Sequence, residues 1–229
     1  MGQTDIRMEE VVDMRLQSAI FDMDGTLLDS MGVWDTLCSD LLREVGCEPE
    51  EGLDTKVKTM SPQQGAAYCR ERYALTQSEN EIVDLIDQRV ERFYREEVTA
   101  KPGVEKVLSL LKMEGVWMYI ATATNRGPAE AALRRTGLDG YFRGILTCAD
   151  AGRGKDSPEI FEMALRRLRC DKKDAVVFED SLHAIRTAKA AGFRVAGVYD
   201  PSSEENQEEI RSIADYYIRS YEDWFELEA

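Results

Sequence analysis

The chain has 229 residues, of which 43% are hydrophobic and 32% are charged, and this composition excludes wholesale disorder. Its 44 acidic and 29 basic residues give a formal net charge of -15, which disfavours general binding to nucleic acid or to an anionic membrane surface. No apolar run approaches the roughly 18 residues that a membrane span needs, and residues 1–17 lack the layout of a signal peptide.

The five cysteines are scattered and odd in number, so the sequence indicates neither a disulfide framework nor a zinc cluster. We therefore expect a reducing, cytoplasmic setting. His183 is the one histidine, which excludes a histidine-based catalytic triad or a multi-histidine metal site within a single chain.

Short apolar runs predict the strands of a buried parallel sheet. Helical patterns separate these runs from residue 102 onward, and Pro102, Pro128, Pro158 and Ser181 stand where helices would begin. This alternation predicts an α/β fold, a Rossmann-like parallel sheet core with helices on both faces. The clear strand candidates are 16–21, 116–121 and 175–178, and the weaker ones are 144–147, 194–198 and 216–218.

The stretch from about residue 32 to residue 98 breaks this alternation, because it shows helical patterns alone. We interpret it as a helical domain inserted after the first strand. The predicted division is 1–31 and 100–229 for the α/β core, and 32–99 for the insertion.

Two carboxylates, Asp22 and Asp24, follow the first predicted strand, and Gly25 after them allows a tight turn. Strand alternation alone would point both side chains the same way. Two carboxylates so close together are costly unless a cation lies between them or one is protonated. Ligands of open α/β sheets bind beyond the carboxyl ends of the strands, so this pair is a candidate site.

Polar groups also follow the other two clear strands. Thr122 follows one of them and Glu179 and Asp180 follow the next, while Lys155 precedes a helix that Pro158 would begin. Hydroxyls, carboxylates and a cation would therefore meet at one edge of the sheet. This set indicates phosphate chemistry with a divalent metal, and hard oxygen ligands favour Mg²⁺.

These motifs, in this order, resemble those of the haloacid dehalogenase superfamily, in the subgroup of small phosphatases and β-phosphoglucomutase-like enzymes with a helical cap. The resemblance covers about residues 16–200. The matching motifs are Asp22-Met23-Asp24-Gly25-Thr26, then Thr122, then Lys155 with Ser157-Pro158-Glu159-Ile160-Phe161, then Glu179-Asp180-Ser181.

The resemblance implies a role for each of four catalytic residues. Asp22 would be the nucleophile that forms an aspartyl-phosphate. Asp24 would protonate the leaving oxygen and then activate water, Thr122 would bond the phosphoryl group, and Lys155 would neutralise negative charge. Dehalogenases resemble this pattern with Tyr at the position of Asp24, and phosphonate-cleaving relatives carry Ala there, so Asp24 favours phosphate esters.

The resemblance also implies a Mg²⁺ site. Asp22, the backbone carbonyl of Asp24, and Asp180 would hold the metal, with Glu179 as a further ligand or as a partner of the ligands. Two departures from the family pattern stand close by. Phe178 stands where relatives often have Gly. Asp156 stands where Pro is common, and its carboxylate could pair with Lys155.

In this subgroup the inserted domain is a cap that closes over the core, with hinges expected near 31–32 and 99–103. Polar or aromatic residues near its turns are candidates for substrate contact, although an ordinary place on a helix surface is the competing interpretation for each. They are Trp34, Lys56, Lys58, Met60 and Arg70.

We therefore expect Mg²⁺-dependent hydrolysis of a small phosphorylated metabolite by a monomer or weak dimer. A phosphosugar mutase of the β-phosphoglucomutase type is the alternative, and a binding or regulatory protein is a third. Such mutases carry a His shortly after the first motif, where this chain has Trp34, and residues 56–61 lack their Arg-x-Lys-Gly pattern. Trp does not titrate near neutral pH, which favours water as the acceptor.

Overall fold

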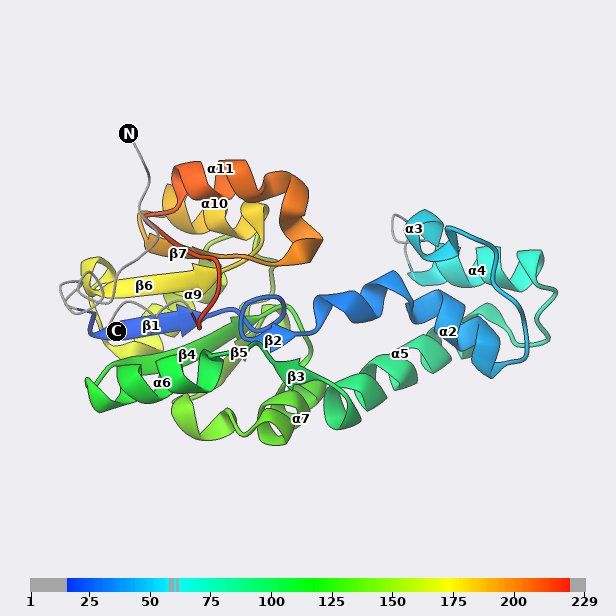
Figure 1. Ribbon diagram of the computed structural model, residues 1–229, viewed down its shortest axis with the longest axis horizontal. Coiled ribbons are helices and arrows are strands. Elements are labelled where there is room, and N and C mark those ends of the chain that lie inside the picture. Colours follow the sequence, from blue (N-terminus) through cyan, green and yellow to red (C-terminus); the bar gives the residue numbers. More distant parts are fainter. Residues whose placement is uncertain (1–15, 58–59, 61, 223–229) are drawn as a thin grey trace. The chain divides into compact units, whose positions relative to one another are not determined.

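A computed structural model describes residues 16–57, 60 and 62–222, and Figure 1 shows it. These residues form two compact units. One is the inserted unit Ser30–Glu97, and the other is the core, which comprises the described residues up to Asp29 and from Val98 onward. The inserted unit begins and ends two residues before the boundaries expected from the sequence. Its action as a cap stays a prediction.

The core is built on a parallel sheet of six strands, in the order β5-β4-β1-β6-β7-β8. All six strand candidates are present, two of them with the predicted ends and four with one or both ends shifted by one or two residues. They are β1 (Ser18–Phe21), β4 (Trp117–Thr122), β5 (Ile145–Thr147), β6 (Ala175–Glu179), β7 (Arg194–Val198) and β8 (Tyr216–Ile218).

The central strands are buried on both faces, which is why they are continuous apolar runs in the sequence. In the register of β1, Phe21 lies between Ile120 of β4 and Phe178 of β6. The rings of Phe21 and Phe178 stack with their centroids 4.2 Å apart. Phe178 is therefore a core residue of the sheet, and the three strands end within two residues of one another.

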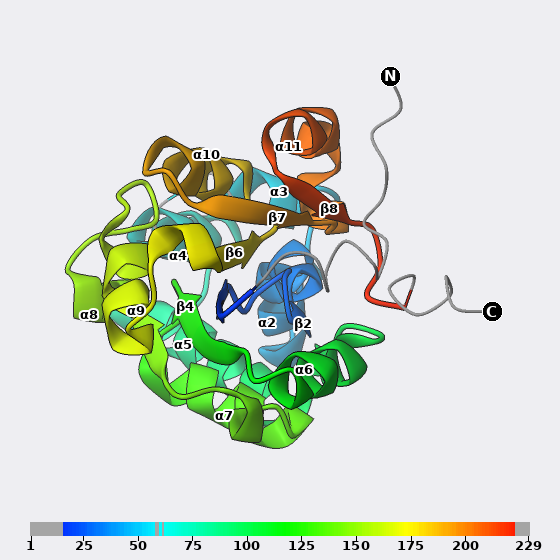
Figure 2. The ribbon, with the colours of Figure 1, turned by 90° about the vertical axis from the view of Figure 1, so that its left-hand side faces the viewer.

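Helices cover both faces of the sheet, as predicted (Figure 2). Residues of α9, α10 and α11 pack in one core cluster with sheet residues such as Ile20 and Val177. Helices α9, α10 and α11 lie in connections that lead toward β8, whereas α6 and α7 lie in connections that lead from β1 to β4 and on to β5, toward the other edge of the sheet. Because such connections are right-handed, α6 and α7 lie on the opposite face. The helices are α6 (Val104–Met113), α7 (Arg126–Thr136), α8 (Cys148–Ala151), α9 (Glu159–Leu168), α10 (Leu182–Ala190) and α11 (Gln207–Ile213), with short 3-10 turns at Asp139–Tyr141, Lys172–Asp174 and Pro201–Asn206.

The starts of the helices differ in detail from the sequence expectation, and α6, for example, begins at Val104, two residues after Pro102. Helix α7 begins at Arg126, two residues before Pro128, because the first turn of a helix needs no internal N–H bond and so tolerates proline. Ser181 is the N-cap residue of α10, as expected, but its hydroxyl does not cap the helix. It lies 2.6 Å from Nδ1 of His183 instead.

A two-stranded antiparallel ribbon of β2 (Leu28–Asp29) and β3 (Thr99–Ala100) closes the core where the chain leaves for the inserted unit and returns. The inserted unit is helical, as predicted. It contains a 3-10 helix (Met31–Asp35) followed by α2 (Leu37–Glu44), α3 (Leu53–Val57), α4 (Pro62–Arg72) and α5 (Glu79–Glu96).

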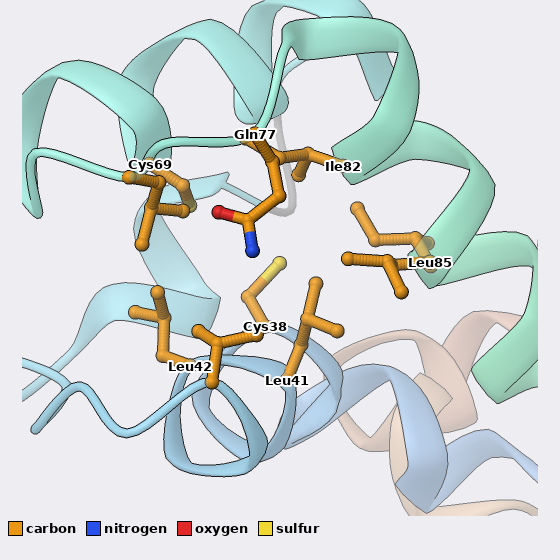
Figure 3. Close-up of a pocket in the computed structure, with 10 residues that line it drawn as sticks. Cys38, Leu41, Leu42, Cys69, Gln77, Ile82 and Leu85 are labelled. Carbon is orange, nitrogen blue, oxygen red and sulfur yellow. The ribbon is translucent and has the colours of Figure 1, made fainter.

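A small apolar pocket lies inside this unit, and Figure 3 shows side chains of Cys38, Leu41 and Gln77 among those lining it. Its volume is about 10 Å³, which is room for about one water molecule. The pocket is thus part of the packing of the unit and is too small for a metabolite.

The candidate contact residues of the inserted unit have different surroundings. Trp34 is 39% exposed. Lys56 donates to the Tyr68 hydroxyl at 2.7 Å, and Arg70 lies 3.6 Å from Glu79. Met60 packs against a buried cluster, and Lys58 lies outside the described residues.

None of the helices described in either unit combines the length and the hydrophobicity that crossing a bilayer requires.

Candidate active site

The loop after β1 is folded tightly against the end of β6. The Asp22 N–H donates to the carbonyl of Phe178 at 2.9 Å, and the N–H groups of Leu27 and Leu28 both donate to Met23. Gly25 has a φ of +77°, and a Cβ there would collide with the Asp180 carboxylate. Glycine is favoured here on both grounds, since a side chain would be strained in the left-handed conformation and would displace the Asp180 carboxylate.

Lys155 lies between two buried carboxylates. Its Nζ donates to Asp22 and, at 2.8 Å, to Glu179. All three side chains are at most 6% exposed. Asp156 is exposed, and the ion pairs that the described residues give Lys155 go to Asp22 and Glu179. The pairing of Lys155 with Asp156 considered from the sequence is therefore wrong, and the cation faces the nucleophile candidate.

A third buried carboxylate completes this group. Asp180 is 4% exposed, and the Thr26 hydroxyl donates to its Oδ1 at 3.1 Å. Carboxylate oxygens of Asp22, Glu179 and Asp180 all lie within 4.8 Å of one another. Three hard oxygen donors at this spacing suit a small divalent cation such as Mg²⁺.

The electrostatics of the group point the same way. Burial raises the pKa of Asp22 and of Glu179, and Lys155 opposes this rise in both. Burial and the charge of Asp22 raise the pKa of Asp180 to about 7. One lysine cannot balance three ionised carboxylates, so a divalent cation would stabilise their ionised forms.

Asp24 lies in a different environment from Asp22. Its Oδ2 accepts a 2.6 Å hydrogen bond from the Thr124 hydroxyl, and its side chain is partly exposed. Within the described residues, the carboxylate group that could hold a metal comprises Asp22, Glu179 and Asp180, without the side chain of Asp24. The two carboxylates after β1 thus have different partners. Asp22 pairs with the ammonium group of Lys155, and Asp24 accepts a hydrogen bond from a hydroxyl.

Thr122 ends β4 and is completely buried. Its Oγ1 accepts a 3.0 Å hydrogen bond from the Thr124 N–H, which fixes the position of the oxygen. The structure therefore brings Asp22, Lys155, Glu179 and Asp180 into direct or neighbouring contact, and links Thr122 to the Asp24 carboxylate through Thr124.

Sequence reasoning assigned no role to two residues that support this site. Thr26 orients Asp180, and Thr124 orients Asp24. Thr26 follows Asp24 by two positions and Thr124 follows Thr122 by two positions, so their closeness in the sequence to predicted site residues could have pointed to them. Arg126, the first residue of α7, pairs with Asp150 at 2.7 Å.

Comparisons with known proteins agree with this geometry. A family model described as haloacid dehalogenase-like hydrolase matches residues 19–198. A phosphorylated carbohydrates phosphatase from Thermotoga maritima is 28% identical over 184 residues, which cover 80% of this chain and 85% of the relative. The pyrophosphatase PpaX of Bacillus velezensis is 28% identical over 196 residues, which cover 82% and 85%.

Among solved structures, a provisionally named β-phosphoglucomutase from Thermotoga maritima superposes with a TM-score of 0.81 at 26% identity, covering 91% of this chain and 97% of that one. The resemblance seen in the motifs and the predicted α/β fold are thereby confirmed. The chain belongs to the haloacid dehalogenase-like hydrolase family, whose model spans it from β1 to the end of β7.

Proposed function

We propose that this hydrolase is a Mg²⁺-dependent phosphatase that cleaves small phosphorylated metabolites through an aspartyl-phosphate on Asp22. The observation that carries the proposal is the buried group of Asp22, Lys155, Glu179 and Asp180 at the carboxyl edge of the sheet. Relatives named as phosphatases of phosphorylated carbohydrates and of hexitols support the substrate class.

In the first half of the reaction, a carboxylate oxygen of Asp22 attacks phosphorus and the bond to the leaving oxygen breaks. Lys155 offsets the repulsion between the carboxylate and the anionic substrate. Bound Mg²⁺, held by Asp22 and Asp180 with Glu179 close by, would supply further positive charge for the phosphoryl oxygens. Asp24 gives its proton to the leaving oxygen, so the alcohol departs neutral.

In the second half, the ionised Asp24 takes a proton from water as that water attacks the phosphorus of the aspartyl-phosphate. The bond between phosphorus and Asp22 breaks, which returns the Asp22 carboxylate and releases inorganic phosphate. The Thr124 hydroxyl would hold Asp24 in place through both steps, and the Thr122 hydroxyl would bond the phosphoryl group.

A phosphosugar mutase is the second candidate, because a structural neighbour with a TM-score of 0.81 carries that name. The competing observation is Trp34, which stands where such mutases have a His after the first motif. Trp has one N–H donor and no acceptor, so it cannot position an acid as His does. We therefore favour water as the acceptor.

One screen separates the candidates. Phosphate release is measured over sugar phosphates, polyol phosphates and nucleotides, with and without Mg²⁺, and Mg²⁺-dependent release from at least one class is expected. In a second arm, the enzyme receives β-glucose 1-phosphate with catalytic glucose 1,6-bisphosphate. Glucose 6-phosphate appearing much faster than free phosphate would overturn hydrolysis in favour of the mutase. Phosphate release that persists after chelation of divalent cations would contradict the role proposed for Mg²⁺.

A further inference from the structure

Three of the five cysteines lie together inside the inserted unit. Cys69 belongs to a buried apolar cluster with Leu42 and Leu53, and Cys38 and Cys47 pack against the same cluster. Cys38 comes from α2 and Cys69 from α4, and both side chains line the small apolar pocket of this unit (Figure 3). Cys47 is not one of the described residues that line it. The fold therefore brings two thiols from separate helices to one place.

These two thiols are hydrogen-bonded to each other, with the S–H group of Cys38 donating to the sulfur of Cys69. The bond raises the pKa of Cys38, and burial adds to this rise. The same bond lowers the pKa of Cys69 against the effect of burial. The thiolate is the reactive form of cysteine, so Cys69 is the nucleophile of the pair and Cys38 keeps its proton.

The surroundings hold Cys38 in place and leave the pair accessible. Oδ1 of Asp54 accepts the N–H groups of Cys38 at 2.8 Å and of Ser39 at 3.2 Å, which satisfies backbone donors in the first turn of α2. The Cys38 residue is partly exposed, so a small molecule in solvent can reach the pair from this side. The pocket of about 10 Å³ beside the thiols leaves room for their sulfur atoms to approach each other.

We propose that Cys38 and Cys69 form a redox-active dithiol, which hydrogen peroxide converts to a disulfide that ties α2 to α4. The Cys69 thiolate attacks one peroxide oxygen and the O–O bond breaks, which leaves a sulfenic acid on Cys69 and a hydroxide that takes up the proton released by Cys69. The Cys38 sulfur then attacks the sulfenic sulfur. The S–O bond breaks, and the Cys38 proton leaves with that hydroxyl as water.

Two thiols and one peroxide thus give one disulfide and two water molecules, and an excess of a thiol reductant reverses the bond by exchange. Such a site suits the reducing setting expected from the sequence, where disulfides are typically transient. The site lies in the inserted unit and uses none of the residues assigned to phosphate chemistry, so it is independent of the proposed function.

The test exposes the whole reduced protein to limiting hydrogen peroxide, alkylates the remaining thiols, and maps the peptides by mass spectrometry without reduction. Cys170, which is partly exposed and whose S–H donates to the Asp171 carbonyl at 3.3 Å, is the internal reference. Cys47→Ser is the matched control, because it removes a thiol of the same cluster from outside the pair. Cys38→Ser and Cys69→Ala each break the pair.

In wild type and Cys47→Ser we expect a linked Cys38–Cys69 peptide that forms at least about 10-fold faster than Cys170 is oxidised, and dithiothreitol should restore both thiols. In Cys38→Ser we expect no disulfide within one chain, and a sulfenic acid on Cys69. In Cys69→Ala we expect Cys38 to stay reduced as long as Cys170 does. Wild-type Cys38 and Cys69 that remain fully alkylatable once Cys170 is oxidised would overturn the proposal, as would a bridge from either one to Cys47. Phosphatase activity is not a readout, so a failure of the proposed function would leave these results unchanged.

Discussion

Replacing Asp180 by Asn should remove the part of the pH dependence of stability that this carboxyl group gives the metal-free protein. The pKa of Asp180 is raised from 3.8 to about 7, chiefly by burial. The folded protein therefore binds more protons than the unfolded chain between these two values. Its stability falls as the pH rises through that window, because the buried carboxyl group must ionise.

The size of the effect follows from that difference. A pKa that lies about 3 pH units above its ordinary value corresponds to at most about 4 kcal/mol, since each unit is worth about 1.4 kcal/mol. Of this, roughly 3 kcal/mol is lost between about pH 5 and about pH 8. For a chain of this size, such a loss lowers the melting temperature by roughly 6–12 °C.

The assay is thermal unfolding of chelated wild type and Asp180→Asn across this pH range. Asn keeps an oxygen that can accept the bond from Thr26, so the comparison removes the charge and little else. The wild type should lose stability more steeply than the variant as the pH rises, and Mg²⁺ should restore the wild type alone. Parallel profiles of the two proteins in the chelated state would refute the reasoning.

Two further substitutions test the supports of the site. Gly25→Ala should lower Mg²⁺ affinity by roughly tenfold in a calorimetric titration, since its Cβ collides with Asp180 and its φ of +77° adds strain; unaltered affinity would contradict the close approach. Thr124→Val should lower kcat for para-nitrophenyl phosphate by roughly 10- to 100-fold, because a hydrogen bond to a charged group contributes about 1.5–3 kcal/mol; a wild-type kcat would mean that the bond to Asp24 has no part in catalysis.

The sheet and its site edge could be predicted because both depend on local patterns. Strands such as β6 are short apolar runs that end directly in acidic residues, and parallel strands bring their carboxyl ends together. The inserted unit was visible as a break in that alternation. Helix α7 began earlier than expected because proline is a weak marker of the exact first residue.

The contacts between distant segments could not be predicted. The pairing of Lys155 with Glu179 rather than with Asp156 depends on how α9 lies against the sheet, and sequence adjacency is a poor guide to it. Likewise, the bond from Thr124 to Asp24 joins two loops separated by a hundred residues.

The central claim is that Asp22 becomes phosphorylated during turnover. The most direct measurement is acid quenching of the enzyme during hydrolysis of para-nitrophenyl phosphate with Mg²⁺, followed by mass spectrometry of the peptide that contains Asp22. We predict a mass gain of one phosphoryl group on Asp22 in the wild type, and neither the gain nor turnover in Asp22→Asn. Sustained turnover by Asp22→Asn, or a phosphoryl group found on another residue, would contradict the account.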